Sequence, residues 1–115
     1  GLAHLGIEAV AWLARESLQS GDLAAALAHV EAVMAHLVSH GNLDGTEKPL
    51  LIRWTCCEVL AAASDERAAG LLADTWQALM ARCTALPDAA AREGFLMAQP
   101  YHRAIQQSAL QAGLV

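Results

Sequence analysis

One helix-turn-helix pattern decides the fold of this chain: Leu13-Ala14-Arg15, Leu18, Gly21-Asp22-Leu23, Ala26 and Val30. It recurs 43 positions later as Cys56-Cys57-Glu58, Ala61, Ser64-Asp65-Glu66, Ala69 and Ala73. An internal repeat of this kind is typical of helical arrays, whose units cannot bury their apolar faces alone and therefore stack on their neighbours. Such arrays form surfaces for binding and rarely sites for chemistry.

The composition favours an all-α fold. The chain has 115 residues, of which 56% are hydrophobic and 4% aromatic. Alanine is the commonest residue, which favours helices packed closely through small side chains, and no segment alternates with the period of two that a strand needs. We therefore predict one all-α domain over residues 1–115, in which antiparallel helical hairpins stack as a short α-solenoid of about six helices.

The first hairpin is predicted over about residues 1–40. Gly21 can adopt the left-handed conformation that ends a helix, and Asp22 can cap the next helix. The first helix, about Leu2 to Gln19, should bury an apolar stripe at helical spacing: Leu5, Ala9, Trp12 or Leu13, and Leu18. The second helix, about Asp22 to Ser39, should bury Leu23, Ala26, Leu27, Val30, Val33, Met34 and Leu37.

The second hairpin, about residues 46–85, follows a polar connection that contains glycine. Its helices are predicted from Thr46 to about Ala63, and from Ser64-Asp65 to about Thr84, the latter burying Leu72, Trp76, Leu79 or Met80, and Cys83. Two capping helices are expected over about residues 87–113, from Asp88 to Met97 and from near Pro100 to Gly113. We expect Phe95 and Tyr101 to close the end of the core, with His102-Arg103 at the surface.

The charge balance argues against a nucleic-acid partner. The net charge is −5, with one Lys and six scattered Arg, whereas phosphate binding needs clustered cations. No apolar run reaches the roughly 18 residues of a membrane helix, and neither a signal peptide nor a disulfide framework is visible. We therefore expect a cytoplasmic protein with reduced cysteines and no membrane partner. Because the chain starts at Gly1 and has no Met before Met34, we expect it to be a piece of a longer protein.

A specific pattern surrounds the first turn, with Leu13 on the first helix, Gly21-Asp22 at the turn and Ala26 where the two helices cross. This pattern resembles a tetratricopeptide repeat. The second copy resembles that family less closely, because Ser64 replaces the glycine and Trp76 occupies a position that is usually small. The resemblance implies a tetratricopeptide-like solenoid in which the first helix of each hairpin faces a concave groove.

A series of short motifs covers about residues 45–105: Gly45-Thr46-Glu47-Lys48-Pro49-Leu50, Trp54-Thr55-Cys56-Cys57-Glu58-Val59-Leu60, Asp65-Glu66-Arg67-Ala68, Phe95-Leu96 and Pro100-Tyr101-His102-Arg103. Together they resemble the C-terminal end of the helical-repeat arm of bacterial STAND-type signalling ATPases, from which Met97-Ala98-Gln99 departs. Those proteins join a P-loop ATPase to a repeat arm, and often to a transcriptional-activator or nucleotide-cyclase domain. The resemblance implies a sensing or interaction arm, and no Walker A loop is present in this chain.

The tetratricopeptide resemblance also implies which residues face the groove: Glu8, Ala11, Arg15, Leu18 and Gln19, then Leu51, Trp54, Glu58 and Ala61. Arg15, Trp54 and Glu58 would set specificity, because an aromatic contact supplies affinity and charges fix the orientation of a partner. The alternative is that Trp54 belongs to the core and that the charges are merely solvated.

A histidine stripe is the second candidate site. His29, His36 and His40 lie at i, i+7 and i+11 of the second helix, within about 40° of one another, and His36 and His40 could share a metal ion. A histidine at the rim of an amphipathic helix is more often structural, however, and no local carboxylate or thiol completes a ligand set. Cys56, Cys57 and Cys83 are expected in the core, because adjacent cysteines on a helix diverge by about 100°.

No motif for nucleophilic catalysis is present, so we predict a non-enzymatic module without a cofactor. Our first hypothesis is the arm of a bacterial regulatory protein, which binds a protein, a peptide or other domains of its parent chain, or forms a homo-oligomer. The alternative is a small-molecule or metal-binding helical sensor that uses the histidine stripe. A pocket around His36 and His40 would favour the sensor, and an open groove around Arg15 and Trp54 would favour the interaction arm.

Overall fold

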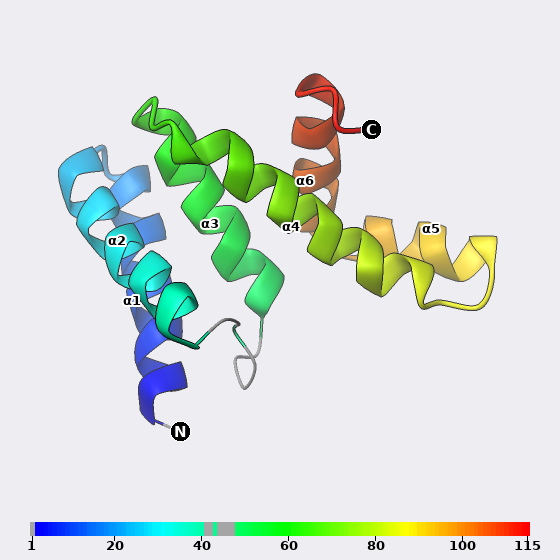
Figure 1. Cartoon of the computed structure of the whole chain (residues 1–115), viewed down its shortest axis with the longest axis horizontal. Helices are drawn as coiled ribbons and strands as arrows, with labels where there is room; N and C mark the ends of the chain where they lie inside the picture. The colour runs from blue at the N-terminus through cyan, green and yellow to red at the C-terminus, as the bar shows by residue number, and fades with distance from the viewer. Residues whose placement is uncertain (1, 41–42, 44–47) are drawn as a thin grey trace.

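A computed structural model describes residues 2–40, 43 and 48–115, with side chains for residues 6–39, 43 and 48–115. The described residues form six helices (Figure 1): α1 (Leu2–Gln19), α2 (Leu23–His40), α3 (Pro49–Ala62), α4 (Arg67–Thr84), α5 (Ala89–Ala98) and α6 (Pro100–Gln111). The predicted all-α class with about six helices is therefore confirmed. The start expected at Thr46 lies outside the described residues, and stacking as a solenoid stays a prediction.

Three of the helices, α1, α3 and α6, end in the same way. Each is followed by a residue with positive φ: Gly21 at 86°, Ser64 at 53° and Gly113 at 77°. The amide of that residue donates to the carbonyl three positions earlier, and the next amide donates to the carbonyl five positions before it, as in a Schellman motif. The left-handed Gly21 is confirmed, and Ser64 adopts the same conformation at the equivalent position of the second copy.

Aspartates hold the turns between the helices. Asp22 Oδ1 accepts a hydrogen bond from the amide of Ala25 at 3.1 Å, so the predicted cap of α2 is confirmed. At the second turn, Asp65 Oδ1 accepts from the amide of Arg67 at 2.9 Å. These carboxylates satisfy amides that have no partner within a helix, and they fix where α2 and α4 begin.

Arg67 links the second turn to α2. Its guanidinium donates to Asp65 from Nε at 3.0 Å and from Nη2 at 2.9 Å, and to Glu31 of α2 from Nη1 at 3.1 Å. The hydrogen bonds from Arg67 lower the pKa of Asp65 to about 2 and hold the pKa of Glu31 below its ordinary value. The same contacts raise the pKa of Arg67 above its ordinary value.

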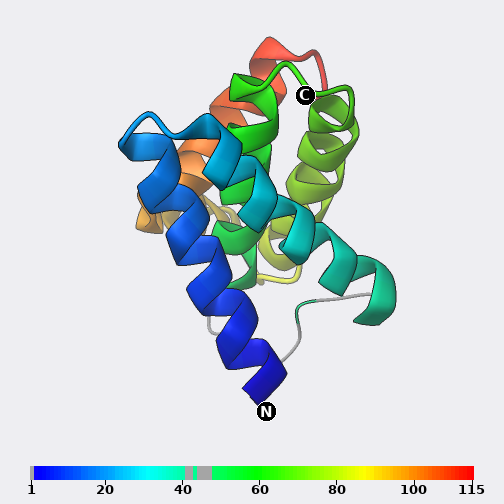
Figure 2. The ribbon, with the colours of Figure 1, turned by 90° about the vertical axis from the view of Figure 1, so that its left-hand side faces the viewer.

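The helices α1, α3 and α6 run side by side in the same direction, with their C-terminal ends on one side of the molecule (Figure 1). Within the described residues, α3 contacts α1, α2, α4 and α6, whereas α1 contacts only α2 and α3. Figure 2 shows the first hairpin, α1 and α2, in front of the other helices. α3 is therefore the centre of the arrangement, and α1 lies at its edge.

Two apolar clusters form the core. The smaller cluster consists of Leu50, Leu79 and Ile105. Trp54 packs against this cluster and also against the larger one. On α2, the predicted face is confirmed, because Ala26, Val30 and Val33 are buried and its other members pack against them. The first and larger cluster comprises Ile7, Ala11, Ala14, Ala26, Val30, Val33, Leu43, Ile52, Cys56, Cys57, Val59, Leu60 and Leu71.

The stripe predicted for α1 is wrong at two positions, Ala9 and the one given as Trp12 or Leu13. Trp12 and Leu13 are 63% and 47% exposed, and Ala9 is exposed as well. The buried face instead carries Ile7, Ala11 and Ala14. Two alanines there let the backbones of α2 and α3 approach α1 closely, which a buried indole would prevent. Leu18 packs against this core as predicted, and the side chain of Leu5 lies outside those described.

The stripe predicted for α4 is partly right. Leu79 and Cys83 are buried as expected, but Leu71 and Thr75 complete the buried face. The Thr75 hydroxyl donates to the carbonyl of Leu71 at 2.7 Å, which satisfies its polar group inside the core. The other residues of the predicted stripe are half-buried: Leu72, Trp76 and Met80.

The C-terminal pair of helices holds a buried aromatic group. Phe95 and Tyr101 are half-buried and pack against the cluster of Leu50, Leu79 and Ile105, as expected. The surface position expected for His102 is wrong, because His102 is only 5% exposed. Its ring lies between Phe95 and Tyr101, with centroid separations of 4.7 and 4.8 Å. Its Nδ1 donates to the carbonyl of Phe95 at 2.9 Å, which fastens α6 to the end of α5.

Candidate functional site

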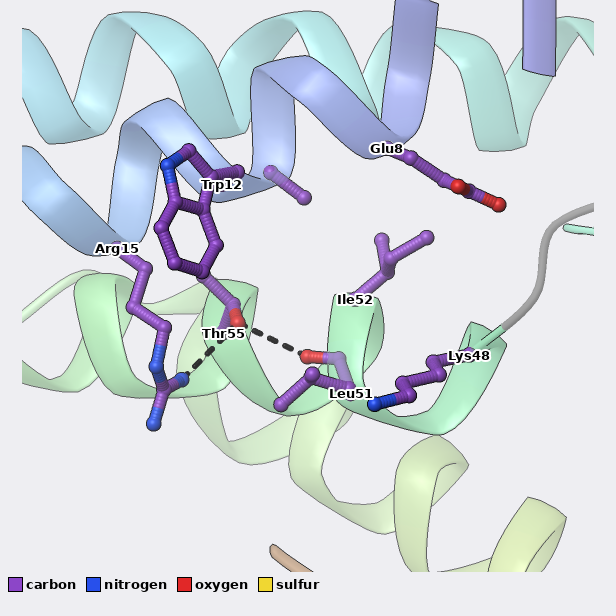
Figure 3. Close-up of a pocket in the computed structure, with 8 residues that line it drawn as sticks. Glu8, Trp12, Arg15, Lys48, Leu51, Ile52 and Thr55 are labelled. Atoms are coloured by element: carbon purple, nitrogen blue, oxygen red, sulfur yellow. Dashed lines mark hydrogen bonds between the residues drawn. The ribbon is translucent and has the colours of Figure 1, made fainter. Parts of the chain in front are cut away.

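A groove of about 280 Å³ lies between α1 and α3, and we call it the α1/α3 groove (Figure 3). On each side, the lining residues follow the i, i+3, i+4, i+7 spacing of a single helical face. α1 contributes Glu8, Ala11, Trp12 and Arg15; α3 and the residue before it contribute Lys48, Leu51, Ile52 and Thr55. The groove is thus formed by one face of each helix, and the two faces lie opposite each other.

The groove combines an apolar floor with charged ends. Ala11 and Ile52 are buried and form part of the larger core cluster, while Leu51 is half-buried. Figure 3 shows Trp12 beside Arg15 at one end, and Glu8 and Lys48 toward the other end. Since Trp12 is 63% exposed, its indole is available to a partner.

Arg15 is held in place by α3. Its Nη1 donates to Glu58 Oε1 at 2.9 Å and to Thr55 Oγ1 at 3.2 Å, and Thr55 in turn donates to the carbonyl of Leu51 at 2.9 Å. The side chains of Arg15 and Glu58 are 31% and 32% exposed. Ion pairs this exposed contribute roughly 0–1 kcal/mol to stability, so the main effect of the pair is to fix the guanidinium at the end of the groove.

A second, wider hollow of about 660 Å³ adjoins α3 on the side of α6, and we call it the α3/α6 hollow. Trp54 and Glu58 of α3 and Ser108 of α6 are among its lining residues. Trp54 is half-buried here and packs against both core clusters. Its structural role is therefore evident, and it is less available to a partner than Trp12.

Eight of the nine predicted groove residues line one of these two sites. The α1/α3 groove contains Glu8, Ala11, Arg15 and Leu51, and the α3/α6 hollow contains Leu18, Trp54, Glu58 and Ala61. Gln19 is exposed on α1 and is in neither lining.

The sequence interpretation also missed groove residues: Trp12, Lys48, Ile52 and Thr55. Their spacing could have revealed them, because each falls on the same helical face as a predicted groove residue of its own side. The helical spacing of Leu5, Ala9 and Leu18 instead predicts Trp12 or Leu13 in the core.

The histidine stripe is described only in part, so a metal site shared by His36 and His40 stays a prediction. His36 is buried at 8% exposure and His29 is half-buried, while the side chain of His40 lies outside those described. Among the described residues, no three His, Cys, Asp or Glu side chains are placed to hold a metal ion together.

The three cysteines are buried, as predicted. Burial raises the pKa of the Cys56 thiol to about 12 and also raises the pKa of Cys57. Cys57 Sγ lies 3.5 Å from Thr75 Oγ1, and Cys83 Sγ lies 3.8 Å from the carbonyl oxygen of Arg92. A thiol with a raised pKa carries little thiolate at neutral pH, and the thiolate is the reactive form. Cys56 and Cys57 are therefore packing residues.

Comparisons with known proteins point to no function for this chain, so the geometry of the candidate site is the basis for a proposal. No protein family, no curated protein and no solved structure matches this chain. In the described part of the chain, every helix is too short or too polar to cross a lipid bilayer.

Proposed function

We propose that this chain is a non-enzymatic helical interaction module that binds a protein or peptide in the α1/α3 groove. The observation that carries the proposal is the exposed indole of Trp12 beside a guanidinium that Glu58 and Thr55 hold in place. Trp and Arg are the residue types that most often dominate binding energy at protein interfaces.

The groove has the properties that a peptide site needs. Ala11, Leu51 and Ile52 provide an apolar floor for a side chain of the partner, and burial of apolar surface is the main source of affinity. Charges at both ends can fix the direction in which a chain lies. Because Arg15 is already ordered, binding costs less side-chain entropy there than it would for a freely rotating arginine.

As for context, we propose that the module is a tetratricopeptide-like arm of a cytoplasmic bacterial regulatory protein of the STAND type. The support is the order of the motifs between Gly45 and Arg103, together with the repeated turn at Gly21 and Ser64. ATP hydrolysis and output would then belong to other parts of such a protein.

Selection of peptides tests the proposed groove. A random peptide library displayed on phage is selected against the purified chain, and the dissociation constants of the enriched peptides are measured by fluorescence polarisation. We expect peptides with an apolar side chain next to a charged one, and Trp12→Ala should weaken their binding by about tenfold or more.

The matched control for this selection is Val38→Ala. Val38 is an apolar residue of α2 that is 87% exposed and lies outside the groove lining, so its loss should leave the affinity unchanged. The proposal is wrong if the enriched peptides bind the wild-type chain and the Trp12→Ala variant equally well, or if no peptide is enriched.

A further inference from the structure

We propose that the partner of the α1/α3 groove is a second copy of this chain, docked about a two-fold axis so that the two α1 helices lie antiparallel. This inference rests on the proposed function, because it names the occupant of the same surface. The axis would pass beside Trp12, between Glu8 and Arg15 on the α1 side of the groove (Figure 3).

The charges on α1 are self-complementary in this arrangement. Glu8 and Arg15 both line the groove and are seven residues apart, so they lie on one helical face about 10 Å from each other along the axis. The midpoint between them falls between Ala11 and Trp12. An antiparallel copy therefore places its Arg15 opposite Glu8 and its Glu8 opposite Arg15, which is the reciprocal contact that a two-fold interface requires.

Arg15 can serve both contacts. Its hydrogen bonds to Thr55 and Glu58 both come from Nη1, and a guanidinium has five N–H donors in a planar fork. The bonds within the chain orient this fork, and its remaining donors can reach a carboxylate of the second copy.

An exposed indole lies at the centre of the same contact. Trp12 is 63% exposed and lines the groove between Glu8 and Arg15. The equivalent residue of α3, Thr55, is buried at 2% exposure, because α3 has helices on several sides. A second α1 would give Trp12 the neighbours that Thr55 already has.

The expected dimer is weak. Each copy contributes one helix of 18 residues and the adjoining groove, which places the contact at the low end of interface sizes. Each copy also carries a net charge of −5, which opposes association outside the contact. We expect a dissociation constant on the order of 10–100 µM.

Sedimentation equilibrium of the 115-residue chain tests the inference. The wild type should be a dimer at about 1 mM and a monomer at about 1 µM. Trp12→Ala should raise the dissociation constant by about tenfold or more, whereas Val38→Ala should leave it unchanged. A wild-type chain that stays monomeric at about 1 mM would overturn the inference.

Charge reversal tests the geometry itself. Glu8→Arg alone places two arginines opposite each other, and Arg15→Glu alone places two glutamates opposite each other, so neither variant should dimerise. An equimolar mixture restores both opposite-charge contacts and should form a heterodimer. Homodimers of Glu8→Arg as strong as the wild type, or a mixture of folded variants that stays monomeric, would contradict the antiparallel contact.

Circular dichroism melting identifies a variant that fails to fold. Arg15→Glu also removes the ion pair with Glu58 and is therefore the variant most at risk. If Arg15→Glu does not fold, Trp12→Ala and Glu8→Arg decide the outcome. The two proposals can also fail separately. A monomeric wild type whose selected peptides still depend on Trp12 would overturn only the second copy as the partner. Peptides that ignore Trp12, together with a monomeric wild type, would overturn the proposed function as well.

Discussion

α1 and α3 carry equivalent positions of one repeat, and yet α3 buries a face that α1 leaves exposed. Trp12 and Leu13 of α1 are 63% and 47% exposed, whereas Thr55 and Cys56, 43 positions later, are 2% and 1% exposed. In the described chain, α3 packs against four helices and α1 against two. A repeated pattern therefore sets the fold of each hairpin, while the number of neighbours decides which faces stay open for a partner.

The two turns differ less than the two helices. Gly21 and Ser64 both have positive φ and both close a Schellman motif. Arg15 and Glu58, another equivalent pair, bind each other across α1 and α3 at 2.9 Å. The two copies of the repeat thus share the backbone geometry of their turns and pair through opposite charges. Substitutions at matched positions can show where the two copies stop being equivalent.

Truncating a leucine in the centre and at the edge should give the largest contrast. Leu60 of α3 is fully buried, and Leu60→Ala should lower the free energy of unfolding by about 2–5 kcal/mol, because it removes apolar contacts and leaves a cavity. Leu13→Ala on α1 should change it by less than about 1 kcal/mol. Urea unfolding at low protein concentration, followed by circular dichroism, measures both, and equal losses would contradict the edge position of α1.

Substitutions of the two turn residues should change the stability of the folded chain in opposite directions. Gly21→Ala places a Cβ at φ 86° and should destabilise the chain by about 1–2 kcal/mol. Ser64→Gly relieves the same strain at φ 53° and should stabilise it by up to about 1 kcal/mol. Thermal unfolding followed by circular dichroism measures both shifts.

The control for the turns is Gly70→Ala. Gly70 lies within α4, and a Cβ built there meets open space. Alanine should therefore stabilise this position by about 0.5–1 kcal/mol. A destabilising Ser64→Gly, with Gly70→Ala behaving as expected, would show that the Ser64 side chain contributes more than its backbone strain costs.

The sequence alone predicts the hairpins well, because their determinants are local. Gly21 and Asp22 act within one turn, and the face of α2 repeats with helical period, so both predictions are confirmed. The face of α1 depends instead on how closely two other helices approach it. Ala11 and Ala14 allow that approach, and Trp12 is left outside for this reason.

The candidate site could be predicted only in part. Glu8, Arg15 and Leu51 meet because α1 and α3 are neighbours, as the repeat implies. Trp54 belongs to a different hollow because α6 packs against α3, and the last segment of the chain carries no copy of the repeat from which that contact could be inferred. Likewise, the burial of His102 depends on Phe95 and Tyr101 closing around it.

The smallest expected effect concerns Arg67, which gives the second turn a link to α2. Asp65 and Glu31 have lowered pKa values because Arg67 hydrogen bonds to their charged forms. A carboxyl whose pKa falls on folding stabilises the folded state above its unfolded pKa, near pH 4, and this stabilisation disappears as the pH falls through its folded pKa. For Asp65, the folded pKa is about 2.

Melting temperatures of the wild type and of Arg67→Met, compared from pH 7 to pH 2, test this link. The wild type should melt at the higher temperature above about pH 5, and the difference should shrink below about pH 4 and be mostly lost near pH 2. Arg103→Met, at an exposed position of α6, should show no such pH dependence. A difference that persists unchanged at pH 2 would mean that Arg67 acts through its aliphatic stem and not through the two carboxylates.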